Sequence, residues 1–411
     1  MSDRPSYRVR AMHCDHRADD DEVFAALRRA TAPLDKAWEK LRCAGRITVK
    51  FNQAWRPDHL VYLDGQLQEL VDPKVAGALL RLLRENTTAE ILCTEISTMA
   101  HRGGDVSVED TITLMQVLRQ YEVPLIDGNQ PPHKLCQVPG GGLMFRQYLL
   151  PESVVETDAM VSVQKMKNHK SMGVTLCLKN LFGLPPMEPH GRSRAYFHHM
   201  VRLPYVLVDL GRVIQPTLSI IDALVGQSGR EWGGEGRICD TLVAGDQVIA
   251  TDACGAWLMG HDPAGDWPDQ PFLRDRNSIL IAAESGFGTA SLDDIDFQSE
   301  VECPLAEFST DELDSFDMVL SWHRTTCEQA LYYRDNRKTL IDKYAGEYIL
   351  LQENVVKWHG KSSKLARSRR DLAGLRKDQA MWLKLVDPEE AEGEHFEVYE
   401  QHLERLRERR W

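Results

Sequence analysis

The chain has 411 residues and a formal net charge of −13, with 43% hydrophobic and 27% charged residues. These values are ordinary for a globular protein, and the length favours two domains over a single core. The negative charge argues against nucleic acid or an anionic membrane as a partner, because both need a positive field. No segment near Met1 has the apolar core of a signal peptide, and no apolar run is long enough to span a membrane. We therefore expect a cytoplasmic protein.

The nine cysteines are scattered, and no two of them stand in a C-x-x-C spacing. This distribution predicts reduced, mostly buried thiols, because cytosolic chains rarely form disulfides. It also argues against an iron–sulfur cluster or a zinc site built from neighbouring cysteines.

The amino-terminal half alternates predicted strands and helices, which implies parallel β-α-β units. A helix over 21–42, interrupted at Pro33, precedes a strand over 46–52 that ends in Lys50 and Asn52. In α/β sheets, ligands gather at the carboxyl ends of such strands. The chain contains neither G-x-G-x-x-G nor the P-loop motif, so nothing indicates NAD or ATP as a cofactor.

The stretch 158–183 is the best candidate for a site. Its first residues, 160–163, are apolar and predict a buried strand, after which the pattern changes to Lys165, Lys167 and His169. An apolar run then follows that still carries Lys179 and Asn180. Buried lysines are rare because removing an ammonium from water is costly. The stretch therefore predicts a functional cluster of cations.

Further candidates follow this stretch. His190 and His198 lie in or after a proline-containing loop, and a strand over 217–223 is predicted to end in Asp222. A glycine-rich loop over 226–236 is a candidate lid. A strand pair over 241–252 is expected to lead into a helix over 253–259, with Asp252 as its N-cap.

The carboxyl-terminal part is expected to form a smaller unit. It predicts a helix ending near 337, a hairpin over 347–359, a basic helix over 362–377, a strand over 381–386 and a charged terminal helix. We interpret the basic helix as a solvated face, and the terminal helix as a candidate contact in a homo-oligomer. The predicted fold class is α/β. A mostly parallel main domain over 1–305, which could comprise two lobes, is followed by a small α+β module over 306–411.

The sequence KMKNH followed by GVTLCLKNLFG, residues 165–183, resembles the signature of the DUF362 proteins, a family named for its lack of a general function. The resemblance extends over about residues 45–300, including the Lys-x-Asn at Lys50 and the strand ending in Asp222. Many members carry a ferredoxin-like cysteine segment, which this chain lacks. The segment LIDKYAGEYILLQENVVKWHGKSSKLA, within about 335–387, is similar to the DUF5678 module.

The residues at the predicted strand ends suggest an enzyme of bacterial small-molecule metabolism, in a specialised pathway, that acts on an anionic carboxylate or phosphate. Lysines and amides suit such a substrate, and the candidate binding residues are Lys50, Asn52, Lys165, Asn180 and Asp222. His169 is the candidate acid–base residue, because its ordinary pKa is near neutrality. Lys179 and Lys167 are candidates for a base or an imine-forming nucleophile.

Two alternatives remain open. In the first, His169, His190 and His198, with Asp222 or Glu95, hold iron or nickel in an oxidoreductase or racemase. The nickel-pincer racemases have a similar stretch of basic residues, histidine and lysine, which is an analogy only. In the second alternative, the cluster binds an anion without turnover, as in a ligand-binding or scaffold protein.

Overall fold

The computed structural model describes residues 7–97, 100, 106–188, 196–361 and 380–408. The strands of its large sheet are β1 (Tyr7–His13), β2 (Arg46–Phe51), β5 (Glu90–Glu95), β6 (Leu125–Asp127), β9 (Ala159–His169), β10 (Gly173–Thr175), β11 (Leu218–Ser228), β12 (Glu235–Gly245) and β13 (Ile295–Ser299). Smaller sheets contain β3 (Tyr62–Leu63) and β4 (Gln66–Leu67), β7 (His133–Gln137) and β8 (Gln147–Pro151), and β14 (Tyr348–Gln352), β15 (Val355–Gly360) and β16 (Trp382–Leu385). The helices are α1 (Asp20–Thr31), α2 (Asp35–Cys43), α3 (Pro73–Asn86), α4 (Met115–Gln120), α5 (Glu152–Val155), α6 (Cys177–Asn180), α7 (Arg202–Ile214), α8 (Val248–Leu258), α9 (Ser278–Glu284), α10 (Phe316–Asp335), α11 (Arg337–Tyr344) and α13 (Glu397–Arg407).

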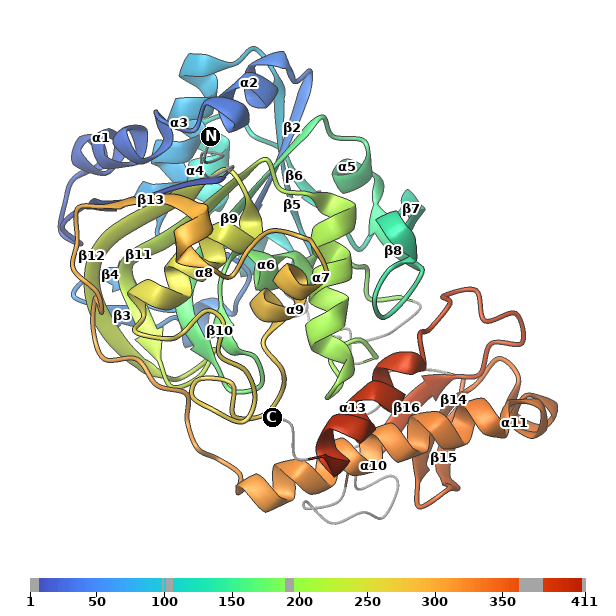
Figure 1. The fold of residues 1–411 in the computed structure, drawn as a ribbon. Helices are drawn as coiled ribbons and strands as arrows, with labels where there is room; N and C mark the ends of the chain where they lie inside the picture. The colour runs from blue at the N-terminus through green and yellow to red at the C-terminus, as the bar shows by residue number, and fades with distance from the viewer. Residues whose placement is uncertain (1–6, 98–99, 101–105, 189–195, 362–379, 409–411) are drawn as a thin grey trace, which may run out of the picture.

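Within these residues the large sheet has the order β13-β1-β12-β11-β9-β2-β5-β6, and β10 pairs with β9 (Figure 1). The pairs β11–β9, β9–β2, β2–β5 and β5–β6 are parallel, whereas β12 is antiparallel to both β11 and β1. The α/β class with a mostly parallel sheet is therefore confirmed. β9 is parallel to both of its neighbours, β11 and β2, so the carboxyl ends of the three strands lie at the same edge of the sheet.

Helices cover both faces of the large sheet (Figure 1). On one face α1, α2 and α3 share an apolar cluster that includes Leu79 and Val161. On the other face α7, α8 and α9 share a cluster that includes Ile249 and Met160. Neighbouring residues of β9 thus point to opposite cores, as the two-residue period of a strand requires. On a strand that is buried on both faces, a charged side chain without a partner would be costly.

β9 and β11 are longer than predicted. Each spans eleven residues, and all of them are buried, including Lys165, Lys167 and Asp222. The expected strand ends at Val163 and Asp222 are therefore wrong. A polar residue normally signals the end of a buried strand, but here cations and carboxylates on adjacent strands compensate each other.

The segment 248–252 is also corrected, because it forms the first turns of α8 and not a strand. Gln247 caps this helix by accepting a hydrogen bond from the Ala250 N–H at 2.7 Å. The run Val-Ile-Ala-Thr is β-branched in part, which favours a strand locally, yet all of these residues are buried between the sheet and α9. Burial in the tertiary structure, and not the local strand preference, therefore determines that this segment is helical.

The carboxyl-terminal part combines an antiparallel sheet of β14, β15 and β16 with α10 and α13 (Figure 1). The predicted hairpin and the strand near 382 are confirmed, whereas the basic helix predicted over 362–377 lies outside the described residues. Arg202 of α7 pairs with Glu394 at 2.9 Å, and Lys384 contacts the same carboxylate at 2.7 Å. All three side chains are buried, so this part contacts α7 of the main domain through a desolvated charge network. Its independence as a domain stays a prediction.

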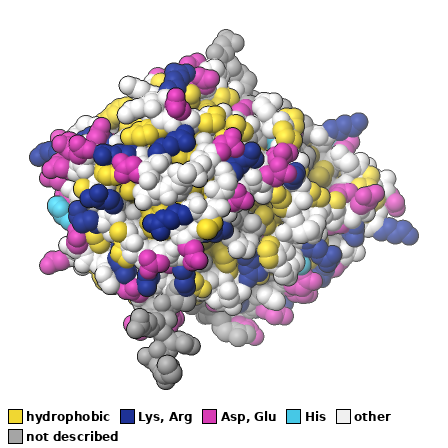
Figure 2. Space-filling model, turned by 90° about the horizontal axis from the view of Figure 1, so that it is seen from above, with side chains coloured by type: hydrophobic (Ala, Val, Ile, Leu, Met, Phe, Trp, Pro, Cys, Tyr) yellow, Lys and Arg dark blue, Asp and Glu magenta, His cyan; other side chains and the backbone are white. Residues whose placement is uncertain are grey.

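The surface over α2, seen from above in Figure 2, mixes Lys and Arg with Asp and Glu side chains and does not gather one sign of charge. Within the described parts of the chain, every helix is too short or too polar to cross a bilayer.

Candidate functional site

Three adjacent parallel strands, β2, β9 and β11, bring the candidate residues to one region of the sheet. Lys50 of β2 is in register with Ser162 of β9, and Lys165 of β9 is in register with Asp222 of β11. Beyond this point β11 is irregular, so that Gln227 lies opposite Lys167. Such an irregularity redirects side chains near the end of a strand.

Lys50 is enclosed by acceptors. Its Nζ donates to Glu95 at 2.8 Å, to the Phe51 carbonyl at 2.7 Å and to Asn180 Oδ1 at 3.3 Å. Asn180 in turn donates to the Lys50 carbonyl and to Ser162 Oγ, both at 3.0 Å. A Cβ on Gly183 would lie 2.8 Å from Lys50 Cε, so the chain after α6 closes directly over this lysine. The group attaches α6 to the sheet and leaves little donor capacity for a ligand.

Lys165 is neutralised as well, on the face covered by α3. Its Nζ lies 2.8 Å from Asp222 Oδ2, and both side chains are fully buried. The Lys165 ammonium makes no hydrogen bond within the described residues, so this contact is an ion pair without hydrogen-bond geometry. Asp222 Oδ2 also accepts the N–H of Asp72, the N-cap of α3. Burial, followed by the nearby Asp222 carboxylate, raises the pKa of Asp72.

Lys167 has different surroundings, although it is also buried. Its Nζ donates to the Glu69 carbonyl at 2.7 Å and lies 4.5 Å from the centre of the Trp232 ring. Among the described residues no carboxylate pairs with it. Burial is the main cause that lowers the pKa of Lys167 to about 7; Glu69 and Glu231 oppose this effect, and the cations of Lys165 and Lys179 add to it. Near neutral pH this amine therefore exists partly as the free base.

Trp232 belongs to the loop 229–234, which covers Lys167. Its ring stacks on Trp55 with 3.9 Å between ring centres and 9° between planes. A second contact holds the loop in place, because the Glu69 carboxylate accepts the Gly233 N–H. The glycine-rich loop predicted over 226–236 is shorter than expected, because β11 extends to Ser228 and β12 begins at Glu235.

His169 ends β9 and is neutral. Its Nδ1 accepts the N–H groups of Ser171 at 3.0 Å and Met172 at 3.2 Å. A nitrogen that accepts hydrogen bonds carries no proton, so the ring proton is on Nε2. Burial, and then the cations of Lys179 and Lys167, hold the pKa of His169 well below its ordinary value. Held in this way, the ring can donate from Nε2 but cannot accept a proton there.

Lys179 and His198 complete the region. Lys179 of α6 is half-buried, with its Nζ 4.5 Å from the centre of the Phe182 ring. The His198 ring packs on His169 at 5.9 Å and meets Phe182 edge-on at 5.7 Å. Burial and the Lys179 cation keep the pKa of His198 well below its ordinary value. The structure therefore brings together Lys167, His169, Lys179 and His198, whereas His190 lies outside the described residues.

Asp252 positions α6 and does not cap its own helix as predicted. It lies inside α8, and its two carboxylate oxygens accept the N–H groups of Cys177 and Leu178, each at 2.8 Å. Burial raises the pKa of Asp252 to about 7. The capping residue of α6 thus comes from a segment 75 residues away, which no local pattern could reveal.

Asn52, the last predicted binding residue, is half-buried and accepts a hydrogen bond from Gln164 at 2.9 Å. Sequence reasoning missed Glu69 and Trp55, which lie in irregular segments without a motif. Glu231 and Trp232 were placed in a candidate lid without a role. Glu231 accepts the Lys170 N–H at 3.2 Å and lies 3.8 Å from His169 Nδ1.

A metal ligated by His169 does not fit this arrangement. Ligation needs a nitrogen lone pair, but Nδ1 is occupied by two backbone N–H groups and Nε2 carries the proton. Among the described residues, the side chains that bring three potential ligand atoms within 4.8 Å of one another are Asp15, His16 and Asp240. That group is on another part of the sheet, and both nitrogens of His16 already contact carboxylates, Asp240 at 2.6 Å and Asp64 at 2.8 Å.

Fold and site together define an α/β protein with a buried lysine–histidine cluster at the carboxyl edge of a parallel sheet. Residues 56–257 match the model of the family described as Domain of unknown function (DUF362), which confirms the DUF362 resemblance over this segment. The similarity of residues 335–387 to DUF5678 stays a prediction.

Two individual proteins are similar to parts of the chain. The thylakoid-associated protein sll1697 of Synechocystis sp. is 29% identical over 126 residues, which are 29% of this chain and 38% of that protein. The match thus spans well under half of that relative's length. The lactate racemase apoprotein from Thermoanaerobacterium thermosaccharolyticum aligns over 56% of this chain and 52% of that chain, with a TM-score of 0.33 and 13% identity. This likeness is too low to transfer a function.

Proposed function

We propose that the region around Lys167 and His169 is the active site of an enzyme that moves a proton on a small anionic metabolite. The observation that carries the proposal is Lys167, a buried amine that has no carboxylate partner among the described residues and whose pKa is about 7. A lysine in that state is a competent base at neutral pH, whereas an ordinary lysine is fully protonated. Lys50, by contrast, pairs with the Glu95 carboxylate at 2.8 Å.

The roles follow from the contacts. Lys167, as the free amine, takes a proton from the carbon next to the substrate's carboxylate, and the C–H electron pair moves onto the carboxylate or carbonyl oxygen. The Nε2–H of His169 donates to that oxygen, as a neutral imidazole can. The proton then returns from Lys167 to a neighbouring carbon, which gives an isomerisation without an oxidant, whereas its return to the same carbon gives proton exchange only. Lys167 and His169 are two residues apart on one strand, about 7 Å along it, a span that suits a small molecule.

The half-buried Lys170 and Lys179 supply the positive field for the substrate anion, because both cations act on His169. This assignment replaces Lys50 and Lys165 as the cations nearest to the substrate, since each of those already faces a carboxylate. The loop 229–234 covers Lys167 through Trp232. We infer that this loop opens to admit the substrate and closes to exclude water.

The test is proton exchange in D₂O on a panel of small 2-hydroxy, 2-oxo and 2-amino acids, followed by proton NMR. We expect the protein to exchange the C2 proton of at least one 2-hydroxy or 2-amino acid, or the C3 protons of at least one 2-oxo acid, and Lys167→Met to abolish this exchange. Lys338→Met is the matched control, since Lys338 is exposed on α11. Exchange that survives in Lys167→Met, or exchange by no member of the panel, would contradict the proposal.

A second mechanism for the same amine is an imine with a carbonyl substrate. The free Lys167 amine adds to the carbonyl, and the adduct loses water to form the C=N bond. Treatment with borohydride in the presence of pyruvate would reduce this bond and add a stable mass to the peptide containing Lys167. A modified peptide assigns the imine mechanism, and its absence while exchange continues assigns the simple base.

A further inference from the structure

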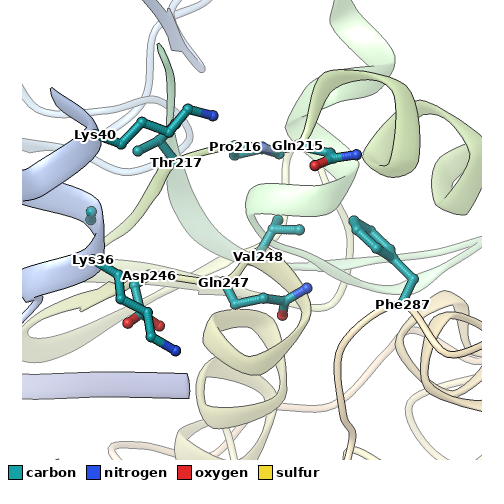
Figure 3. A pocket seen from close by; sticks show the side chains of 10 residues that line it. Lys36, Lys40, Gln215, Pro216, Thr217, Asp246, Gln247, Val248 and Phe287 are labelled. Carbon is teal, nitrogen blue, oxygen red and sulfur yellow. The ribbon is translucent and has the colours of Figure 1, made fainter. Parts of the chain in front are cut away.

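A second cavity lies at the opposite, amino-terminal edge of the large sheet. It has a volume of about 270 Å³ and is lined by α2, by the chain entering β11 and by the start of α8 (Figure 3). Its walls combine polar and apolar side chains, namely Lys36, Lys40, Gln215, Thr217, Asp246, Gln247, Val248 and Phe287. None of these residues belongs to the region around Lys167.

Thr217 is the feature that points to a ligand. The residue is 7% exposed, and its Oγ1 has no hydrogen-bond partner within the protein. Its backbone N–H is occupied by the Met160 carbonyl at 2.7 Å, so the residue is held in place by the sheet at the wall of the cavity. A buried hydroxyl without a partner is costly, and such groups are rare in native proteins. A polar ligand in the cavity would satisfy it.

The charges around the cavity favour an anion. Lys36 and Lys40 are four residues apart on α2, so both project on one side of that helix. No ion pair with Lys40 is found among the described residues, and Figure 3 shows its side chain extending over the cavity near Thr217. The first turn of α8, with Gln247 and Val248 in the wall, adds the positive end of an eleven-residue helix.

The remaining walls define the rest of the ligand. Phe287 and Val248 provide an apolar side opposite α2 (Figure 3). Asp246 is fixed by accepting the Arg8 N–H at 2.8 Å and adds one negative charge to the rim. A ligand of low charge with an apolar body is therefore better matched than a polyanion.

We propose that this cavity is a second ligand site, which binds a small organic anion through Lys40, Thr217 and the start of α8. The anionic group lies between the Lys40 ammonium and the Thr217 hydroxyl, and its apolar body contacts Phe287. The site is independent of the proposed active site, because it lies at the other edge of the sheet and shares no residue with it.

Lysine acetylation followed by mass spectrometry tests this proposal at the residues themselves. We expect benzoate to slow the acetylation of Lys40 several-fold, and benzyl alcohol, which lacks the charge, to have no effect. Phenyl phosphate in a parallel arm distinguishes a carboxylate site from a phosphate site. Lys338, exposed on α11, is the internal control and should react at the same rate throughout. Equal protection of Lys338, or no protection of Lys40 by either anion at 10 mM, would overturn the proposal.

Calorimetry with the same probes tests the two named side chains. Thr217→Val keeps the shape of the side chain but removes the hydroxyl, and we expect it to weaken benzoate binding about fivefold. Lys40→Gln should weaken it by a similar factor or more, and neither change should unfold the protein, because Lys40 is exposed and valine fits the same space. Protection of Lys40 must persist in Lys167→Met, which separates this site from the active site. Unchanged affinity in both Thr217→Val and Lys40→Gln would show that the anion binds elsewhere.

Discussion

The middle and the end of β9 carry the same kind of residue in different electrostatic settings. In the middle, Lys165 Nζ lies 2.8 Å from Asp222 Oδ2 on the neighbouring strand β11, and both side chains are fully buried. At the end, Lys167 Nζ donates to the Glu69 carbonyl and lies over the Trp232 ring, and no carboxylate among the described residues pairs with it. A paired buried lysine stays charged and contributes to structure, whereas an unpaired one loses its proton readily. A buried lysine can therefore be assigned a structural or a chemical role only after its partners are known.

The largest expected effect concerns the middle of β9. Asp222→Ala removes the carboxylate that pairs with the buried Lys165, so we expect the free energy of unfolding to fall by about 3–5 kcal/mol. Urea denaturation followed by circular dichroism measures the change, with the exposed Asp342→Ala as a control near zero. A loss below about 1 kcal/mol would mean that the contact between Lys165 and Asp222 does not stabilise the fold.

The pH dependence of the free energy of unfolding tests the lowered pKa of Lys167 at the end of β9. The pKa of Lys167 is about 7 in the folded protein against an ordinary 10.5, so between these values the unfolded chain binds more protons. The contribution of Lys167 to the free energy of unfolding therefore rises with pH, by an order of a few kcal/mol from pH 7 to about 10.5, and is lost as pH falls through 7. Denaturation across this range should show a steeper rise in wild type than in Lys167→Met. Parallel curves would refute the lowered pKa.

A smaller effect is expected at Asp252, which supports α6 from the other side of the site. Asp252→Asn replaces one acceptor oxygen by an amide that opposes a backbone N–H, and we expect a loss of about 1–2 kcal/mol. The same change should reduce any activity of the site, because α6 carries Lys179. Denaturation and the exchange assay are the measurements, and Asp342→Asn is the control. Full activity in Asp252→Asn would separate α6 from the chemistry.

The smallest effect on stability is expected for Lys167→Met at about pH 10.5, where the Lys167 amine is uncharged in the folded protein. Methionine has similar length and no charge to desolvate, so the free energy of unfolding should change by less than about 1 kcal/mol while exchange activity is lost. Lys50→Met, by contrast, leaves Glu95 buried without its cation and should be strongly destabilising. If both variants lose stability equally, the distinction between paired and unpaired lysines is wrong.

Much of the architecture was predictable because it depends on local patterns. The alternation of apolar periods indicated the α/β class, and Pro33 correctly separated α1 from α2. The unusual lysines of 165–179 also marked the region of the proposed site, since cations inside apolar runs need a special reason. The predicted roles were less accurate, because Lys50 and Asn180 turned out to bind each other.

The sequence by itself therefore determined the class of fold, the order of most elements and the stretch that carries the cations. Those features follow from period, composition and turn residues, which act over a few positions. Only the tertiary structure decided which lysine has a carboxylate partner, which helix Asp252 caps and which nitrogen of His169 holds the proton. These properties depend on groups distant in the chain, and a pKa is set by distance and burial. For Lys167 burial lowers the pKa of the side chain to about 7.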